Sequence, residues 1–123
     1  MKIFFDGGLR PGGMEYAVVM GGQARIVRDL GPGTSMTAEW LALIAATQAA
    51  HEAGLTDALL LGDAAAVVAQ ATGKIRVPPA HVAHFAEWSA LPRPPRFRLR
   101  HIKRTQNLAG IALGRVHQGL PPL

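Results

Sequence analysis

Three acidic residues occupy positions where a carboxylate could do chemistry. Asp6 follows the apolar run KIFF, Glu39 lies near the start of the helix-forming stretch AEWLALIAATQAAHEAG, and Asp63 ends the apolar run ALLLG. Each has an ordinary structural explanation: a turn aspartate before glycine, a favourable charge at a helix N-terminus, and a helix N-cap. Taken one at a time, the structural explanation is favoured for each of them.

Taken together, the three acids indicate a metal site. If the first and fourth predicted strands are parallel neighbours, Asp6 and Asp63 emerge at their carboxyl ends, the edge where sites form in α/β sheets. A helix packed across those strands brings Glu39 into the same cleft. Converging carboxylates repel one another and must either take up protons or bind a cation. Because all the ligands are oxygens, Mg²⁺ or Mn²⁺ fits best, and two such ions can activate water to attack a phosphodiester.

The elements that would position these acids follow from hydrophobic patterning and turn residues. They are strands at 2–6, 15–20 and 23–30, a helix at 38–54, a strand at 58–63, helices at 64–73 and 79–90, a strand at 96–102 and a helix at 105–118. Three strands joined by short turns predict an antiparallel meander, and the two strands reached through helices should run parallel to the first. The fold class is therefore α/β, with a mixed five-stranded sheet flanked by helices.

Length and composition set the class of protein. With 123 residues, of which 49% are hydrophobic and 17% charged, residues 1–123 are expected to form a single globular domain. No apolar run approaches the roughly 20 residues of a membrane span, and the N-terminus does not resemble a secretion signal. The chain has no cysteine, which excludes a disulfide partner and thiolate metal sites. We therefore expect a cytoplasmic protein with no membrane association.

The net charge of +5 is distributed unevenly along the chain. Residues 1–87 carry six Lys and Arg against all eight acids, a net charge of −2, whereas residues 88–123 carry seven Lys and Arg and no acid, a net charge of +7. A concentration of positive charge is typical of a surface that binds a polyanion such as nucleic acid. A solvated basic face that aids solubility is an equally good explanation from charge alone.

Four segments in order resemble the type 1 ribonuclease H family. FFDGG resembles the strand end that carries its first metal-binding aspartate, and TSMTAEWLALIAA resembles its helix with the catalytic glutamate. LLLGDAAAVVAQATG resembles the segment of the third acid, and RHIKRTQNLAGIALG resembles the closing signature. The match spans essentially the whole chain and agrees with the predicted order of elements.

The resemblance implies a hydrolase, an endonuclease that cleaves the RNA strand of an RNA–DNA hybrid and leaves 5′-phosphate and 3′-hydroxyl ends. It assigns Asp6, Glu39 and Asp63 as catalytic metal ligands for Mg²⁺ or Mn²⁺. Further positions are expected to contact nucleic acid, some by matching the family and others as basic side chains beside phosphates. They are Gly7, Thr34, Ser35, Gln70, Arg98, Arg100, His101, Lys103, Arg104 and Asn107. For His101, a structural role and a phosphate-facing role both remain open.

The sequence also departs from the family pattern. The paired asparagines of the glutamate helix become Ser35-Met36, the residue after the third ligand is Ala64, and the basic handle region is absent. Most importantly, the fourth acid of the family's site becomes Ile111, and no acid follows Glu87 in the chain. Losing one anionic ligand should weaken the second ion and leave the first nearly intact.

Three functions remain in competition. The leading one is a ribonuclease H, and its main rival is a non-catalytic nucleic-acid-binding module on the same fold. The third is a structural subunit whose basic tail docks an acidic partner protein. Trp40 and Trp88 are interpreted as packing residues, and a metal site at His81 and His84 is not expected because they lack an acidic or thiolate partner.

Overall fold

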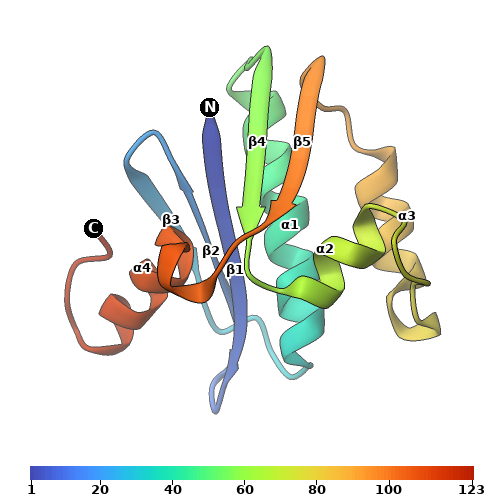
Figure 1. The fold of residues 1–123 in the computed structure, drawn as a ribbon. Helices are drawn as coiled ribbons and strands as arrows, with labels where there is room; N and C mark the ends of the chain where they lie inside the picture. Colours follow the sequence, from blue (N-terminus) through green and yellow to red (C-terminus); the bar gives the residue numbers. More distant parts are fainter.

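The computed structural model describes residues 1–123, and its first three strands form the predicted meander (Figure 1). They are β1 (Lys2–Arg10), β2 (Gly13–Met20) and β3 (Gln23–Val27), and each pairs with the next in antiparallel fashion. β1 is longer than the predicted strand 2–6, because Gly7 and Gly8 continue the pairing with β2 and the turn falls at Pro11-Gly12. β3 ends at Val27, before the predicted residue 30. Two residues later, Asp29 takes a positive φ of 58°, which does not fit an extended strand.

Two further strands, β4 (Asp57–Gly62) and β5 (Arg96–His101), complete a sheet of order β3-β2-β1-β4-β5. β4 runs parallel to β1, and β5 runs parallel to β4. The mixed five-stranded sheet predicted from the sequence is therefore confirmed. Parallel pairing brings the carboxyl ends of β1, β4 and β5 to the same edge of the sheet.

Helices lie on both faces of the sheet (Figure 1). They are α1 (Ser35–Glu52), α2 (Ala65–Ala71), α3 (Val82–Ala90) and α4 (Leu108–His117), with 3₁₀ turns at Pro79–His81 and Arg104–Gln106. α1 packs along β1 and β2 on one face with α3 against it, whereas α4 packs on β1, β2 and β3 on the opposite face. No helix is long and apolar enough to span a membrane.

The two faces of the sheet bury cores of different size. The larger core lies between the sheet and α1, and it includes Ile3, Phe5, Trp40, Leu43 and Leu60. The smaller core lies under α4 and consists of Ala17, Val19, Ala109, Ala112 and Leu113. Both tryptophans are buried in the larger core, so their interpretation as packing residues is confirmed.

Both α1 and α4 begin at a capping residue. Thr34 caps α1, and its hydroxyl accepts a hydrogen bond from the Thr37 backbone N–H at 3.0 Å. Asn107 caps α4 in the same way, through a bond of 3.1 Å from the Ala109 N–H. Because these caps satisfy N–H groups that the helix leaves without partners, they fix where each helix starts. α1 therefore begins three residues before the predicted residue 38, and α4 begins at 108 after the 3₁₀ turn rather than at 105.

Gly7 marks the closest approach between β1 and α1. A Cβ atom added at Gly7 would lie 2.3 Å from the carbonyl carbon and oxygen of Ala38 and 2.6 Å from the Glu39 nitrogen. These neighbours are backbone atoms, which cannot move aside as a flexible side chain can. The next glycine, Gly8, has nothing within 4 Å of such a Cβ. Only glycine therefore lets α1 lie this close to the strand.

We expect Gly7→Ala to lower the free energy of unfolding by about 2 kcal/mol or more, because the added methyl group must push α1 away from β1. Gly8→Ala is the matched control, and it should change stability far less. Chemical denaturation of the two variants measures the difference. Equal stability of the two proteins would show that the close contact at Gly7 does not constrain the fold.

Candidate metal centre

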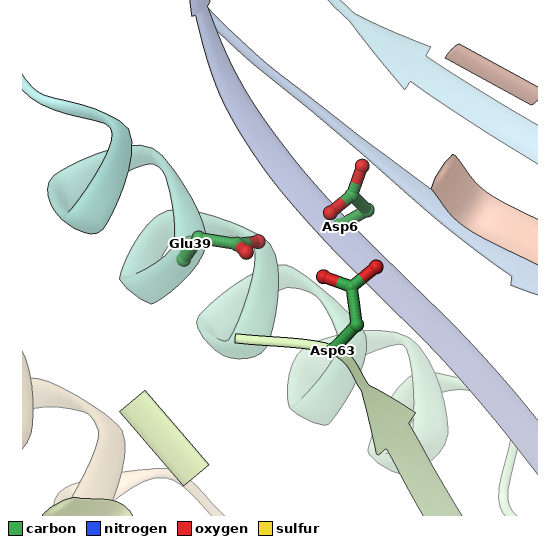
Figure 2. A group of neighbouring side chains, drawn as sticks. All are labelled: Asp6, Glu39 and Asp63. Atoms are coloured by element: carbon green, nitrogen blue, oxygen red, sulfur yellow. The ribbon is translucent and has the colours of Figure 1, made fainter. Parts of the chain in front are cut away.

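Asp6, Glu39 and Asp63 converge at the carboxyl edge of the sheet. They come from β1, from α1 and from the residue directly after β4. One carboxylate oxygen from each lies within 4.8 Å of the other two. Figure 2 shows the three side chains pointing toward a common space between the strands and the helix. The predicted convergence is thus present in the structure.

The local structure explains how each acid reaches this space. Ile3 and Phe5 are buried in the core beside α1, so by strand alternation Asp6 points to the opposite face of the sheet. Asp63 follows Gly62 at the end of the parallel neighbour of β1. Glu39 approaches from α1, and the Gly7 N–H donates a hydrogen bond to its carboxylate. The glycine that permits the close contact therefore also holds the glutamate.

The structural explanations for two of these acids do not hold. The first turn of α1 contains no acidic residue, because Glu39 lies in the second turn, beyond the capping interaction at Thr34. The N-cap position of α2 is Ala64 and no side chain caps this helix, so Asp63 is not an N-cap. Neither carboxylate is thus explained by stabilisation of a helix end.

Crowding of the carboxylates changes their protonation. Burial, followed by the negative charge of Asp63, raises the pKa of Asp6 to about 7. Burial and the charge of Asp6 raise the pKa of Glu39 to about 8. The positive charge of Arg104 and the Gly7 N–H oppose both shifts without cancelling them. A bound cation would favour the ionised forms, and a set made only of carboxylate oxygens is the type of site that Mg²⁺ and Mn²⁺ prefer.

The acids lie in a cleft of about 740 Å³. β1, α1, α2, the 3₁₀ turn at Arg104–Gln106 and α4 all contribute to its wall. Around the acids, the lining includes Gly7, Gly8, Leu9, Arg10, Glu15, Ser35, Met36, Ala64, Arg104, Gly110, Ile111, Gly114 and His117. The space is open to solvent and large enough to admit part of a polymeric substrate.

Ile111 lies in the cleft, where the sequence comparison places the family's fourth acid. Its side chain is 42% exposed, which is high for a branched apolar residue. The neighbouring Gly110 lies against Asp6, since a Cβ atom there would be 3.2 Å from the Asp6 Oδ2. α4 therefore borders the three acids directly, and at Gly110 and Ile111 it contributes no carboxylate to them.

Sequence reasoning missed a fourth carboxylate in the cleft, that of Glu15 on β2. The closing segment of the chain holds no acid that could replace the one lost at Ile111, but Glu15 lies far from it in the sequence. Glu15 pairs with Gly8 across the hairpin, and its negative charge adds to the rise in the Asp6 pKa. A hairpin register that places Ala17 opposite Asp6 would have put Glu15 on the same face of the sheet. This register is the signal that could have found Glu15, but the register is a feature of the folded hairpin that the sequence pattern did not fix.

Glu15 differs from the other three acids because side chains of the protein engage both of its carboxylate oxygens. Its side chain is 3% exposed and accepts a hydrogen bond from the Arg28 Nε at 3.2 Å. Its other oxygen lies 2.5 Å from the Nε2 of His117, a second cleft residue that sequence reasoning missed. With both oxygens engaged, Glu15 forms a fixed wall of the cleft and is not a free metal ligand in this conformation.

The predicted nucleic-acid contacts divide into three groups by position. Gly7, Ser35 and Arg104 line the cleft beside the acids. Thr34 is exposed at the start of α1, and Lys103 is exposed at the start of the 3₁₀ turn. Arg98, Arg100 and His101 are exposed on β5, outside the cleft.

Gln70 and Asn107, which were also predicted to contact nucleic acid, are buried and hydrogen-bonded within the protein. Gln70 is buried, its oxygen accepts a hydrogen bond of 3.2 Å from the Trp40 indole, and its amide nitrogen lies 3.8 Å from the Met36 sulfur. Asn107 is fully buried, and its amide donates to the Phe5 carbonyl at 3.0 Å. Asn107 thereby ties the start of α4 to β1, one residue before Asp6. Both side chains are thus held inside the protein, and their contact with nucleic acid stays a prediction.

The raised pKa values of Asp6 and Glu39 predict how stability depends on pH. Between about pH 4 and pH 8 the folded protein holds protons that the unfolded chain has lost, so in EDTA the melting temperature should fall as the pH rises. Mg²⁺ or Mn²⁺ should raise it, and more so at pH 8 than at pH 5, because fewer protons then compete with the metal. Thermal unfolding at both pH values tests this expectation.

The double variant Asp6→Asn, Glu39→Gln serves as the control for this experiment. It should show a flatter pH dependence in EDTA and little stabilisation by either ion. If the melting temperature of the wild-type protein depends on pH as that of the double variant does, Asp6 and Glu39 do not have raised pKa values.

Comparison with known proteins agrees with this geometry. Residues 17–116 match the model of the reverse transcriptase-like family. No curated protein matches the sequence significantly. Among solved structures, the chain is similar to the N-terminal ribonuclease H domain of a Mycobacterium tuberculosis protein, with 26% identity, a TM-score of 0.71 and 96% of each chain covered.

Two further structures support the same placement. Ribonuclease H1 from Halobacterium salinarum is 28% identical with a TM-score of 0.69, over 86% of this chain and 87% of that one. LC11 ribonuclease H1, solved in complex with an RNA/DNA hybrid, is 23% identical with a TM-score of 0.71 over the same shares, and it shows the shared fold. The chain therefore belongs to the reverse transcriptase-like family, as a member of its type 1 ribonuclease H group.

Proposed function

We propose that this protein is a nuclease that hydrolyses the RNA strand of RNA–DNA hybrids and depends on Mg²⁺ or Mn²⁺. The observation that carries the proposal is the convergence of Asp6, Glu39 and Asp63, whose oxygens lie within 4.8 Å of one another in an open cleft. Three separate elements position these acids, and none of the three acids has both of its oxygens engaged by side chains as Glu15 has. Such an arrangement is costly unless a cation binds.

The three carboxylates would hold the metal. Bound Mg²⁺ or Mn²⁺ supplies an activated water for attack on phosphorus and stabilises the charge on the leaving oxygen. Glu39 is kept in place by the Gly7 N–H, and Asp6 is held by the strand that Asn107 ties to α4. The ligands therefore sit on rigid elements, which lowers the cost of organising them for the reaction.

Arg104 is the cation best placed to receive the substrate. It lines the cleft, and its charge acts on both Asp6 and Glu39. A guanidinium there can bind a phosphate of the scissile strand and partly offset the repulsion between that phosphate and the three acids. Ser35, at the start of α1 on the opposite wall, adds an exposed hydroxyl for a contact to sugar or phosphate.

A second candidate function is a binding module without turnover, and the specific observation that favours it is Ile111. A neutral side chain at the cleft wall leaves any second ion with one ligand fewer. The three remaining acids nevertheless keep a geometry in which one ion can be held by carboxylates alone. We therefore propose catalysis with a weakly held second ion, ahead of binding alone.

Cleavage of a labelled RNA–DNA hybrid tests the proposed function. The wild-type protein should cut the RNA strand with Mn²⁺ or Mg²⁺ and leave the DNA strand intact. Asp63→Asn should lower the rate by at least about 100-fold, because one metal ligand loses its charge while the side chain keeps its size. Retained hybrid binding without cleavage in any divalent ion would instead identify a binding module.

Ile111→Asp tests whether the missing carboxylate limits activity. The restored charge should lower the concentration of Mn²⁺ needed for half-maximal cleavage by about tenfold, because it supplies a ligand for the second ion. Ile111→Asn is the matched control, since it is polar and of the same size but uncharged. If the two variants respond alike, Ile111 does not stand in for a metal ligand.

A further inference from the structure

The face of the sheet that carries α4 is only partly covered. α4 packs on β1, β2 and β3, whereas no helix lies over the same side of β4 and β5 (Figure 1). The apolar residues of β5, Phe97 and Leu99, pack into the core on the side of α1. By alternation, the side chains of Arg96, Arg98 and Arg100 point to the uncovered side, and all three residues are exposed. These three residues form the arginine row.

The arginine row has little acidic compensation. The one acid on the uncovered part of this face is Asp57, which lies 4.0 Å from an Arg98 nitrogen. Both side chains of that pair are about half exposed, so water and salt screen the attraction strongly. Arg96 and Arg100 form no ion pair at all. Lys2, which belongs to the same side of β1, adds a further exposed positive charge.

The arginine row leads directly to the metal centre. In the sheet register, Leu61 lies between Phe4 and Arg100, and the next residues of the same parity on β1 and β4 are Asp6 and Asp63. Residues of one strand face repeat about every 6.6 Å, so the row spans about 13 Å and ends roughly one repeat from the acids. At about 3.4 Å per nucleotide of a stacked strand, this path covers about four to six nucleotides.

We propose that the arginine row binds the phosphate backbone of a single-stranded nucleic acid segment that continues from the substrate held in the cleft. This inference rests on the proposed function, because it takes the cleft as the place where the hybrid binds. A row that is one residue wide fits one backbone better than the two of a duplex. The uncovered face exposes no aromatic side chain on which bases could stack, so the contact is to phosphates and independent of sequence.

The test measures binding separately from cleavage. In the Asp63→Asn background, where cleavage should be slow, and without divalent ions, fluorescence anisotropy compares a blunt hybrid of about 12 base pairs with the same hybrid carrying a tail of about eight nucleotides. Tails of RNA and of DNA are placed at each end in turn, because the row lies on only one side of the cleft. We expect tails of one polarity to tighten binding by about tenfold, for RNA and DNA alike.

Replacing the arginine row should remove this advantage. Arg96→Gln, Arg98→Gln and Arg100→Gln combined should bring the affinity for the tailed hybrid close to the affinity for the blunt one. The slope of log affinity against log salt concentration for the tailed hybrid should become shallower by about two, since each lost phosphate contact contributes roughly 0.7. Binding of tailed hybrids that is unchanged in the triple variant overturns the proposal.

Arg25 provides a matched control for loss of charge. It is exposed on β3, where it pairs with Val18, whose side chain packs on the side of α1, so Arg25 lies on the opposite face from the arginine row. Arg98→Gln should weaken binding of the tailed hybrid more than Arg25→Gln, and equal effects would show a nonspecific loss of charge. Failure of the proposed function would appear differently, as intact tail binding by a wild-type protein that cleaves no hybrid.

Discussion

The backbone of Gly7 lies against Ala38 and Glu39 with no room for a side chain, and the position of the metal centre depends on this contact. It sets the distance between β1 and α1, and its N–H holds the Glu39 carboxylate. Parallel pairing of β4 with β1 places Asp63 beside the end of β1. The strand pairing thus fixes Asp63 relative to Asp6, and the Gly7 contact fixes Glu39 relative to both. A shift of α1 by the width of a methyl group would therefore separate the ligands as well as loosen the core.

The cost of this arrangement is electrostatic. Partial burial and mutual repulsion raise the pKa values of Asp6 and Glu39 toward and above neutrality, so the metal-free site retains protons that ordinary carboxylates would lose. Arg104 offsets part of the repulsion from the cleft wall. Glu15 shows the alternative solution, since Arg28 and His117 engage both of its oxygens and make it part of the structure. Glu15 is thus a structural part of the cleft wall, whereas Asp6, Glu39 and Asp63 remain the candidate metal ligands.

The sequence was sufficient to predict features that depend on local pattern and chain order. These are the strand and helix order and the parallel placement that joins Asp6 to Asp63. The sequence was insufficient for residues whose position depends on strand register or on how helices dock. Glu15 enters the cleft only through the pairing of β1 with β2, and Asn107 is buried because α4 docks on Phe5. The resemblance assigned Gln70 a contact with nucleic acid, and it gave no sign of the hydrogen bond that Gln70 accepts from Trp40.

The same balance of charge clarifies what Ile111 does in the metal-free protein. A carboxylate at this position would be an additional negative group near Asp6, because a Cβ atom added to the neighbouring Gly110 would lie only 3.2 Å from the Asp6 Oδ2. With isoleucine there, α4 packs through its small residues Ala109 and Ala112 without adding repulsion. Under the proposed function, isoleucine at this position lowers the repulsion among the acids of the metal-free protein and leaves a second ion with one ligand fewer. A second ion that is held by fewer ligands binds more weakly, so its occupancy should depend more strongly on the concentration of divalent cations. The proposed activity should therefore be highest where these cations are abundant.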